Sequence, residues 1–149
     1  MLDPFLFNDM KKAVDRIFTA IENNEKIMIF SDYDADGIPG AVAFHDFFKK
    51  IKYENFSNYI PDRNKDGFGL NSKVINLFLK DGVKLVVTID CGIADVFEAE
   101  ELKKNKIDLI ITDHHKEGDV LPEALAIIDH QVEGEKYPEK LFIRGWDYF

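Results

Sequence analysis

Apolar residues along the chain fall into short runs that alternate with longer segments in which they recur every three or four positions. The short runs predict strands at residues 27–30, 55–60, 84–90, 107–112 and 124–129. Helical spacing marks residues 8–23, 38–51, 72–80 and 94–105. Because strands and helices alternate throughout, we expect an α/β fold with an open, mainly parallel five-stranded sheet and helices on both faces.

The expected burial differs between these segments. The apolar residues of 8–23 occupy one face of a helix, which should pack on the sheet without contributing chemistry. In 38–51 they cover most of the circumference, so this helix should be heavily buried. The β-branched runs at 84–90 and 107–112 are typical of strands buried on both faces.

Four of the five expected strands end in an aspartate. These residues are Asp32, Asp90, Asp113 and Asp129. Parallel strands present their carboxyl ends at one edge, which is where ligands bind in open α/β sheets. Aspartates also begin ordinary turns, but four at one edge, two of them within richer clusters, favour a metal site.

The richest cluster is DYDADG, which carries carboxylates at Asp32, Asp34 and Asp36. Carboxylate oxygens at this density suit Mg²⁺, Mn²⁺ or Ca²⁺. The same letters begin a calcium-binding EF-hand loop, which needs a glutamate at its twelfth position and a helix before it. Counted from Asp32, that position is Ala43, and the preceding run has strand character, so we reject the EF-hand. A solvated acidic turn stays open as an alternative.

The second cluster, TDHH, adds imidazole groups to the carboxylates. The combined candidates are Asp34, Asp36, Asp90, Asp113, His114 and His115. Such a set can hold two divalent cations about 4 Å apart, one activating a water and both stabilising charge on a phosphoryl group. Asp90, alone at its strand end, is our candidate for the carboxylate that bridges them. Histidine in the set makes Mn²⁺ more plausible than Mg²⁺.

The adjacent histidines should have different roles. In an extended segment His114 and His115 point to opposite sides, so we assign His114 to the metal and His115 to the substrate phosphate. Alternatively, one of them caps the turn by hydrogen bonding. His45 and His130 have no acidic cluster near them in the sequence, and we interpret both as structural.

The stretch PDRNKDGFGLN, residues 61–71, is rich in turn-forming residues and follows the weaker strand. Arg63 should lie at the same sheet edge, where its guanidinium suits a phosphate, although a surface arginine stays the alternative. Gly67 and Gly69 are expected to serve loop geometry. Cys91 is expected to be a small packing residue, since no group that would activate a thiolate stands beside it.

Composition narrows the possible functions. With 149 residues, of which 46% are hydrophobic and 13% aromatic, the chain suits one folded domain. Its net charge of −9 argues against a protein that coats nucleic acid generally, because phosphate binding leaves a basic footprint. One cysteine excludes an internal disulfide, and no apolar run approaches a membrane span, so we expect a cytoplasmic location.

Four motifs occur in an order and spacing that resemble the DHH phosphoesterase superfamily. They are DYDADG, YIPDR with GFGLN, TIDCG and TDHH. TDHH alone would indicate only the superfamily. The combination of DYDADG with YIPDRNKDGFGLN resembles the RecJ family of single-strand exonucleases within it, from about residue 26 to residue 141.

This resemblance implies an enzyme that hydrolyses single-stranded DNA from the 5′ end with Mn²⁺ or Mg²⁺. The metal ligands that it implies are Asp34, Asp36, Asp90 and His114. His115 would contact the phosphate or the transition state, and Asp32 would be a supporting acid near the site. We add Asp113 as a further catalytic candidate. Arg63 would position the phosphate.

The chain also departs from that family. Related enzymes carry a further metal-binding aspartate well downstream of DHH and a second domain that clamps the nucleic acid. Neither falls within residues 1–149, so we expect a single, incomplete DHH domain and weak binding of single-stranded DNA. Residues 131–149 form an atypical tail, and Asp147 within it is not assigned as a ligand.

Two other functions stay open. A DHH phosphoesterase that acts on short oligonucleotides or small phosphate compounds would need no long DNA groove. A binding or scaffold module would keep the fold without turnover, although it would have no chemical need for the full set of acidic and imidazole ligands.

Overall fold

The computed structural model describes residues 2–62 and 67–138. Five strands form one sheet in the order β2-β1-β3-β4-β5, and every neighbouring pair is parallel. The strands are β1 (Lys26–Ser31), β2 (Phe56–Tyr59), β3 (Val83–Ile89), β4 (Asp108–Thr112) and β5 (Ala126–Ile128). The helices are α1 (Met10–Glu22), α2 (Gly37–Lys50), α3 (Ser72–Lys80) and α4 (Val96–Lys104), preceded by the short 3₁₀ helix η1 (Pro4–Leu6). The predicted α/β architecture is confirmed.

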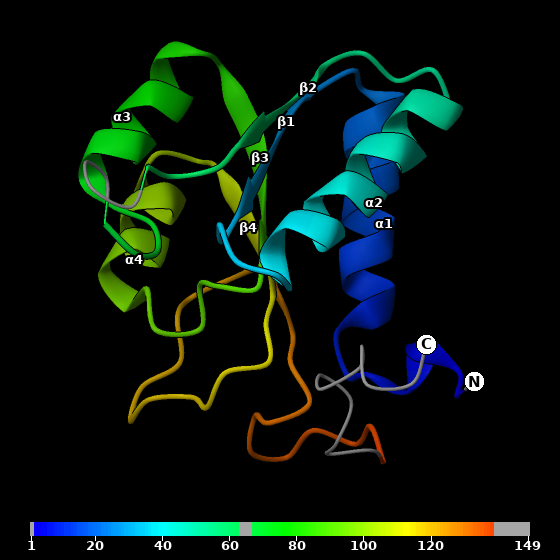
Figure 1. The fold of residues 1–149 in the computed structure, drawn as a ribbon, viewed down its shortest axis with the longest axis vertical. Coiled ribbons are helices and arrows are strands. Elements are labelled where there is room, and N and C mark those ends of the chain that lie inside the picture. The colour runs from blue at the N-terminus through cyan, green and yellow to red at the C-terminus, as the bar shows by residue number, and fades with distance from the viewer. Residues whose placement is uncertain (1, 63–66, 139–149) are drawn as a thin grey trace.

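Helices cover both faces of the sheet, with α1 and α2 on one side and α3 and α4 on the other (Figure 1). Under α1 and α2 the core contains Ala13, Ala20, Ala41, Phe48, Ile29, Leu85 and Val87. Under α3 and α4 it contains Val74, Phe78, Leu102, Phe30, Val86 and Leu109. Successive residues of β3 thus enter opposite cores, as expected for a strand that is buried on both faces.

Helix α2 is less buried than its sequence predicts. Ile38, Val42 and Phe47 are between 39% and 51% exposed, and the buried residues of the helix are Gly37, Ala41 and Phe48. The expectation of heavy burial around the helix is wrong, because α2 lies on the sheet by one face and nothing among the described residues covers the opposite face.

The carboxyl ends of the strands lie together at the lower edge of the sheet in Figure 1, where the chain leaves β1, β3 and β4 in loops. The start of the atypical tail borders this edge. There Asn8 Nδ2 donates to Gly134 O at 3.0 Å, and the rings of Phe7 and Tyr137 stack with centroids 4.1 Å apart. Gly134 and Tyr137 therefore join the tail to the N-terminal segment, while Asp147 lies outside the described residues.

Across residues 2–62 and 67–138, none of the helices combines the length and the apolar character needed to cross a membrane.

Candidate metal centre

Backbone hydrogen bonds that extend the sheet bring three aspartates together. The N–H of Asp32 donates to Ile89 O at 3.1 Å, that of Asp90 to Thr112 O at 2.9 Å and that of Asp113 to Ile128 O at 3.1 Å. Each aspartate follows its strand by one residue and is tied to the last residue of the next strand in the sheet. The three side chains consequently meet at one edge, as their positions in the sequence predict.

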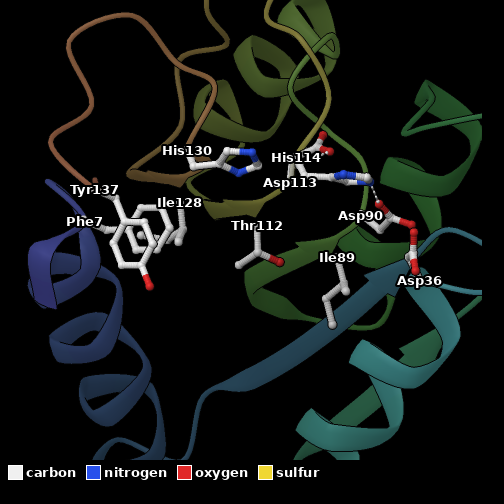
Figure 2. A pocket seen from close by; sticks show the side chains of 10 residues that line it. All are labelled: Phe7, Asp36, Ile89, Asp90, Thr112, Asp113, His114, Ile128, His130 and Tyr137. Carbon is white, nitrogen blue, oxygen red and sulfur yellow. Dashed lines mark hydrogen bonds and ion pairs between the residues drawn. The ribbon is translucent and has the colours of Figure 1, made fainter. Parts of the chain in front are cut away.

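Asp90 is the most strained of these residues. Its φ of 62° lies in the left-handed region, which few residues with a side chain adopt. The residue is 6% exposed. His114 Nε2 lies 2.8 Å from Asp90 Oδ1 as an ion-pair contact (Figure 2), yet neither carboxylate oxygen accepts a hydrogen bond from the described residues. Desolvation, followed by the side-chain hydrogen bond from the protonated carboxyl to Asp34 and by the negative charge of Asp34, raises the pKa of Asp90 to about 7.

In the acidic turn after β1, the surroundings of Asp34 favour the ionised carboxylate, whereas those of Asp90 favour the protonated one. Asp34 Oδ1 accepts hydrogen bonds from the N–H groups of Asp36 at 2.8 Å and Gly37 at 3.0 Å. These bonds, with that from Gly37 first, lower the pKa of Asp34. Gly37 permits the tight turn, because a Cβ there would lie 2.5 Å from the carbonyl oxygen of Asp32.

Two groups of potential ligands share one carboxylate. Asp90 forms the first with His114 and His115 and the second with Asp32 and Asp34, and within each group one ligand atom per residue lies within 4.8 Å of the others. Asp36 belongs to neither group but lines the adjoining pocket. A buried carboxylate that lacks hydrogen bonds from the described residues and is common to two ligand groups is the arrangement that a pair of cations requires.

Both histidines face this cluster, so the expectation that they point to opposite sides is wrong. Their ring centroids are 4.5 Å apart. Strand β4 ends at Thr112, and the next residues bend as Asp113 Oδ1 accepts from the N–H groups of His114 at 2.8 Å and His115 at 3.2 Å. The alternation of an extended strand therefore does not reach the two histidines.

Asp113 organises this bend and orients His115. Its Oδ1 lies 2.7 Å from His115 Nδ1, and its Oδ2 accepts from Ile93 N at 3.0 Å. Desolvation lowers the pKa of His115, but the hydrogen bond and charge of Asp113, together with the charges of Asp90 and Asp129, outweigh it and the pKa is raised. Asp113 thus uses its oxygens to hold the loop, and His115 is biased toward its protonated form.

A pocket of about 330 Å³ adjoins the cluster. Figure 2 shows carboxylates and His114 at one end and the stacked rings of Phe7 and Tyr137 at the other. His130 also lines it, 7% exposed and with its Nδ1 4.0 Å from Asp129 Oδ1. The turn after β5 brings His130, which we interpreted from its sequence as structural, to the same edge as the acidic cluster. A histidine directly after a strand-ending aspartate was the signal available in the sequence.

The remaining candidates are placed more simply. His45 Nδ1 lies 3.0 Å from Asn58 Nδ2 and its ring meets Phe56 edge to face, which agrees with a structural role. Cys91 is buried, and desolvation raises the pKa of its thiol, which agrees with packing. Asp129 is buried, which raises its pKa, and its Oδ1 accepts from Gln131 N at 2.8 Å. Arg63 lies outside the described residues.

Residues 26–137, three quarters of the chain, match the family model described as the DHH family, N-terminal domain. The chain belongs to the DHH family. The two clusters that form the candidate metal centre both lie within the matched residues of this DHH domain.

Curated relatives of the DHH domain carry the name single-stranded-DNA-specific exonuclease RecJ. The RecJ of Bacillus subtilis (strain 168) is 46% identical over 126 residues, which cover 84% of this chain and 16% of that protein. The RecJ of Escherichia coli (strain K12) is 33% identical over 118 residues, which cover 79% of this chain and 20% of that protein. The match therefore spans about a sixth to a fifth of the length of these relatives.

Solved structures agree with the fold. A crystal structure of exonuclease RecJ bound to manganese superposes with a TM-score of 0.80 at 26% identity, over 90% of this chain and 34% of that one. RecJ from Thermus thermophilus in complex with Mn²⁺ gives a TM-score of 0.70 at 25% identity, over 83% of this chain and 17% of that one.

Proposed function

We propose that this DHH domain is the catalytic N-terminal part of a metal-dependent phosphodiesterase that hydrolyses single-stranded DNA from its 5′ end. The observation that carries the proposal is Asp90, a buried carboxylate that accepts no hydrogen bond from the described residues and is shared by two groups of potential ligands. The relatives named as single-strand-specific exonucleases support the substrate, and the manganese-bound RecJ structures support the cofactor.

The residues present fit two divalent cations. A buried carboxylate beside a second carboxylate is unfavourable unless a proton or a cation neutralises it. Asp90 is such a carboxylate, because it is buried beside Asp34. The proposed ligands are Asp34, Asp36, Asp90 and His114, with Asp90 as the bridge. A mixed set of carboxylates and imidazole suits Mn²⁺ and also admits Mg²⁺. When bound, the cations would supply Lewis acidity and a water nucleophile of lowered pKa.

The chain's own residues would position the substrate. His115, biased toward its protonated form and held by Asp113, would donate a hydrogen bond to a phosphoryl oxygen. Asp32, buried and within 4.8 Å of ligand atoms of Asp34 and Asp90, would add negative charge that supports the cations. Arg63 is proposed from the sequence alone as a phosphate-positioning residue.

One observation favours a second candidate. The chain carries a net charge of −9, and a long DNA strand adds one phosphate charge per nucleotide, so binding of a strand needs basic surface. Short oligonucleotides or small phosphate compounds need less of it. The second candidate is therefore a phosphodiesterase for short substrates.

The test combines metal binding with cleavage. We expect titration calorimetry to show two Mn²⁺ ions bound by the wild-type chain and at most one by Asp90→Asn. Cleavage of 5′-phosphorylated single-stranded DNA that the variant lacks would support the first candidate, whereas cleavage of dinucleotides alone would support the second. Metal binding without turnover of either substrate would contradict both, and it would favour a binding module.

A further inference from the structure

An exposed aromatic ring stands beside the candidate metal centre without a role in the function proposed above. Phe68 is 59% exposed, and its ring meets that of His115 edge to face, with centroids 6.5 Å apart and an interplanar angle of 88°. An apolar side chain that is more than half exposed gains only part of the stabilisation that full burial would give. Its contact with the histidine proposed to bind phosphate points to a role with substrate.

The loop around Phe68 is built to hold the ring outward. Gly67 and Gly69 have φ of 79° and 73°, in the left-handed region that favours glycine. The next residue, Leu70, is buried in the core beneath α3 and α4. Phe68 therefore lies between two residues with left-handed backbone, and its ring stays at the surface while Leu70 enters the core.

Asp95 fixes this loop from the segment that precedes α4. Its Oδ2 accepts a hydrogen bond from Leu70 N at 2.8 Å. A Cβ at Gly69 would lie 2.7 Å from Asp95 Oδ1, so the carboxylate fills the space that a side chain at Gly69 would need. The hydrogen bond that anchors the loop thus lies two positions after Phe68 in the chain.

We propose that Phe68 stacks on a nucleobase next to the phosphate at the metal centre, and that Asp95 is the positioning residue for it. This inference rests on the proposed function and adds how the substrate's bases are held. Every base has a face that can stack, so such a contact binds a single strand without regard to its sequence. In a chain with a net charge of −9, stacking supplies binding that does not depend on basic side chains.

The kinetic test uses 5′-phosphorylated oligothymidylate and the same strand with an abasic residue on either side of the cleaved bond. Phe68→Ala should raise KM and lower kcat/KM by about 5- to 150-fold on the intact strand, which corresponds to the loss of one stacked base. On the strand that lacks the stacked base, wild type and Phe68→Ala should have the same KM and the same kcat/KM. Phe18→Ala, at an exposed phenylalanine of α1, is the matched control and should change neither value. An equal loss on intact and abasic strands would overturn the proposal.

The positioning role of Asp95 has its own variants. Asp95→Asn keeps an oxygen that can accept from the N–H of Leu70, so its KM on the intact strand should stay close to the wild-type value. Asp95→Ala loses this acceptor and should raise KM on the intact strand without changing KM on the abasic one. A loss of kcat in Asp95→Ala with unchanged KM would contradict this role.

A binding measurement separates this inference from the proposed function. The fluorescence of Phe68→Trp should be quenched by phosphorothioate-linked oligothymidylate in Mg²⁺, less so by its abasic analogue, and neither should quench Phe18→Trp to the same extent. If the intact phosphorothioate strand quenches the fluorescence but the ordinary phosphodiester strand is not cleaved, the proposed function is overturned and the stacking contact still holds. Absence of quenching in Phe68→Trp would overturn the stacking contact, whatever the activity.

Discussion

Replacing Asp90 with asparagine should stabilise the metal-free chain at alkaline pH. Desolvation and the neighbouring carboxylates raise the pKa of Asp90 from 3.8 to about 7. From about pH 4 to about pH 7, the carboxyl therefore keeps its proton in the folded chain and loses it in the unfolded chain. Because the folded state binds more protons in this interval, the free energy of unfolding falls as the pH rises through it.

The size of this effect follows from the change in pKa. From about pH 5 to about pH 7, one proton contributes at most about 3 kcal/mol, at about 1.4 kcal/mol per pH unit. This is an upper bound, since Asp34 is exposed and solvent screens part of its repulsion with Asp90. Asparagine has nearly the same shape and no proton to lose, so Asp90→Asn should remove this part of the pH dependence. About 3 kcal/mol is a large fraction of the about 5–15 kcal/mol that stabilises a typical domain.

The assay is urea unfolding followed by circular dichroism from about pH 5 to about pH 8 in EDTA. Asp119→Asn, at an exposed aspartate, serves as the control and should follow the wild-type curve. Mn²⁺ at about one hundred times its Kd should then stabilise the wild type by about 2.7 kcal/mol and Asp90→Asn by much less. If the wild-type and Asp90→Asn curves run parallel in EDTA, the argument from burial and repulsion is refuted.

Three further predictions concern the frame of the site. Gly37→Ala should destabilise the chain by about 1–3 kcal/mol in urea unfolding and weaken Mn²⁺ binding, because its Cβ would meet Asp32 O at 2.5 Å; an unchanged Mn²⁺ Kd would contradict this. Asp113→Asn should cost about 1–3 kcal/mol, since an amide presents an N–H₂ group to the donors of the loop; wild-type stability would contradict it. Cys91, 1% exposed, should react with a thiol reagent only in denaturant, and rapid labelling of the native chain would contradict its burial.

The sequence predicts the sheet and its functional edge because those features are local. Continuous apolar runs such as residues 84–90 are fully buried only in a strand that is covered on both faces. Strand β3 is buried as expected apart from Lys84. The aspartates that follow these strands then share an edge by topology alone. The ligand groups around Asp90 thus follow from the strand ends and the parallel order of the sheet.

Features that depend on packing between distant segments were less predictable. The exposed face of α2 carries the large apolar residues Ile38, Val42 and Phe47, so hydrophobicity alone does not reveal which side meets the sheet. The orientation of His115 depends on how Asp113 bends the chain after β4. The hydrogen bond between Asp95 and Leu70 joins residues 25 positions apart, and no local pattern marks it.

Asp90 shows why the functional edge can be distinguished from an ordinary acidic turn. Its left-handed backbone, its burial and the lack of hydrogen bonds from the described residues to its oxygens each oppose the folded state. A solvated turn would relieve the burial and the unpaired oxygens by exposing the carboxylate, as the chain does at Asp34, whose oxygen is paired with backbone N–H groups. Local rules of this kind are usually broken together only at functional sites. A pair of cations would neutralise the buried charge and bind its oxygens, which would account both for the burial and for carboxylate oxygens that accept no hydrogen bond from the described residues.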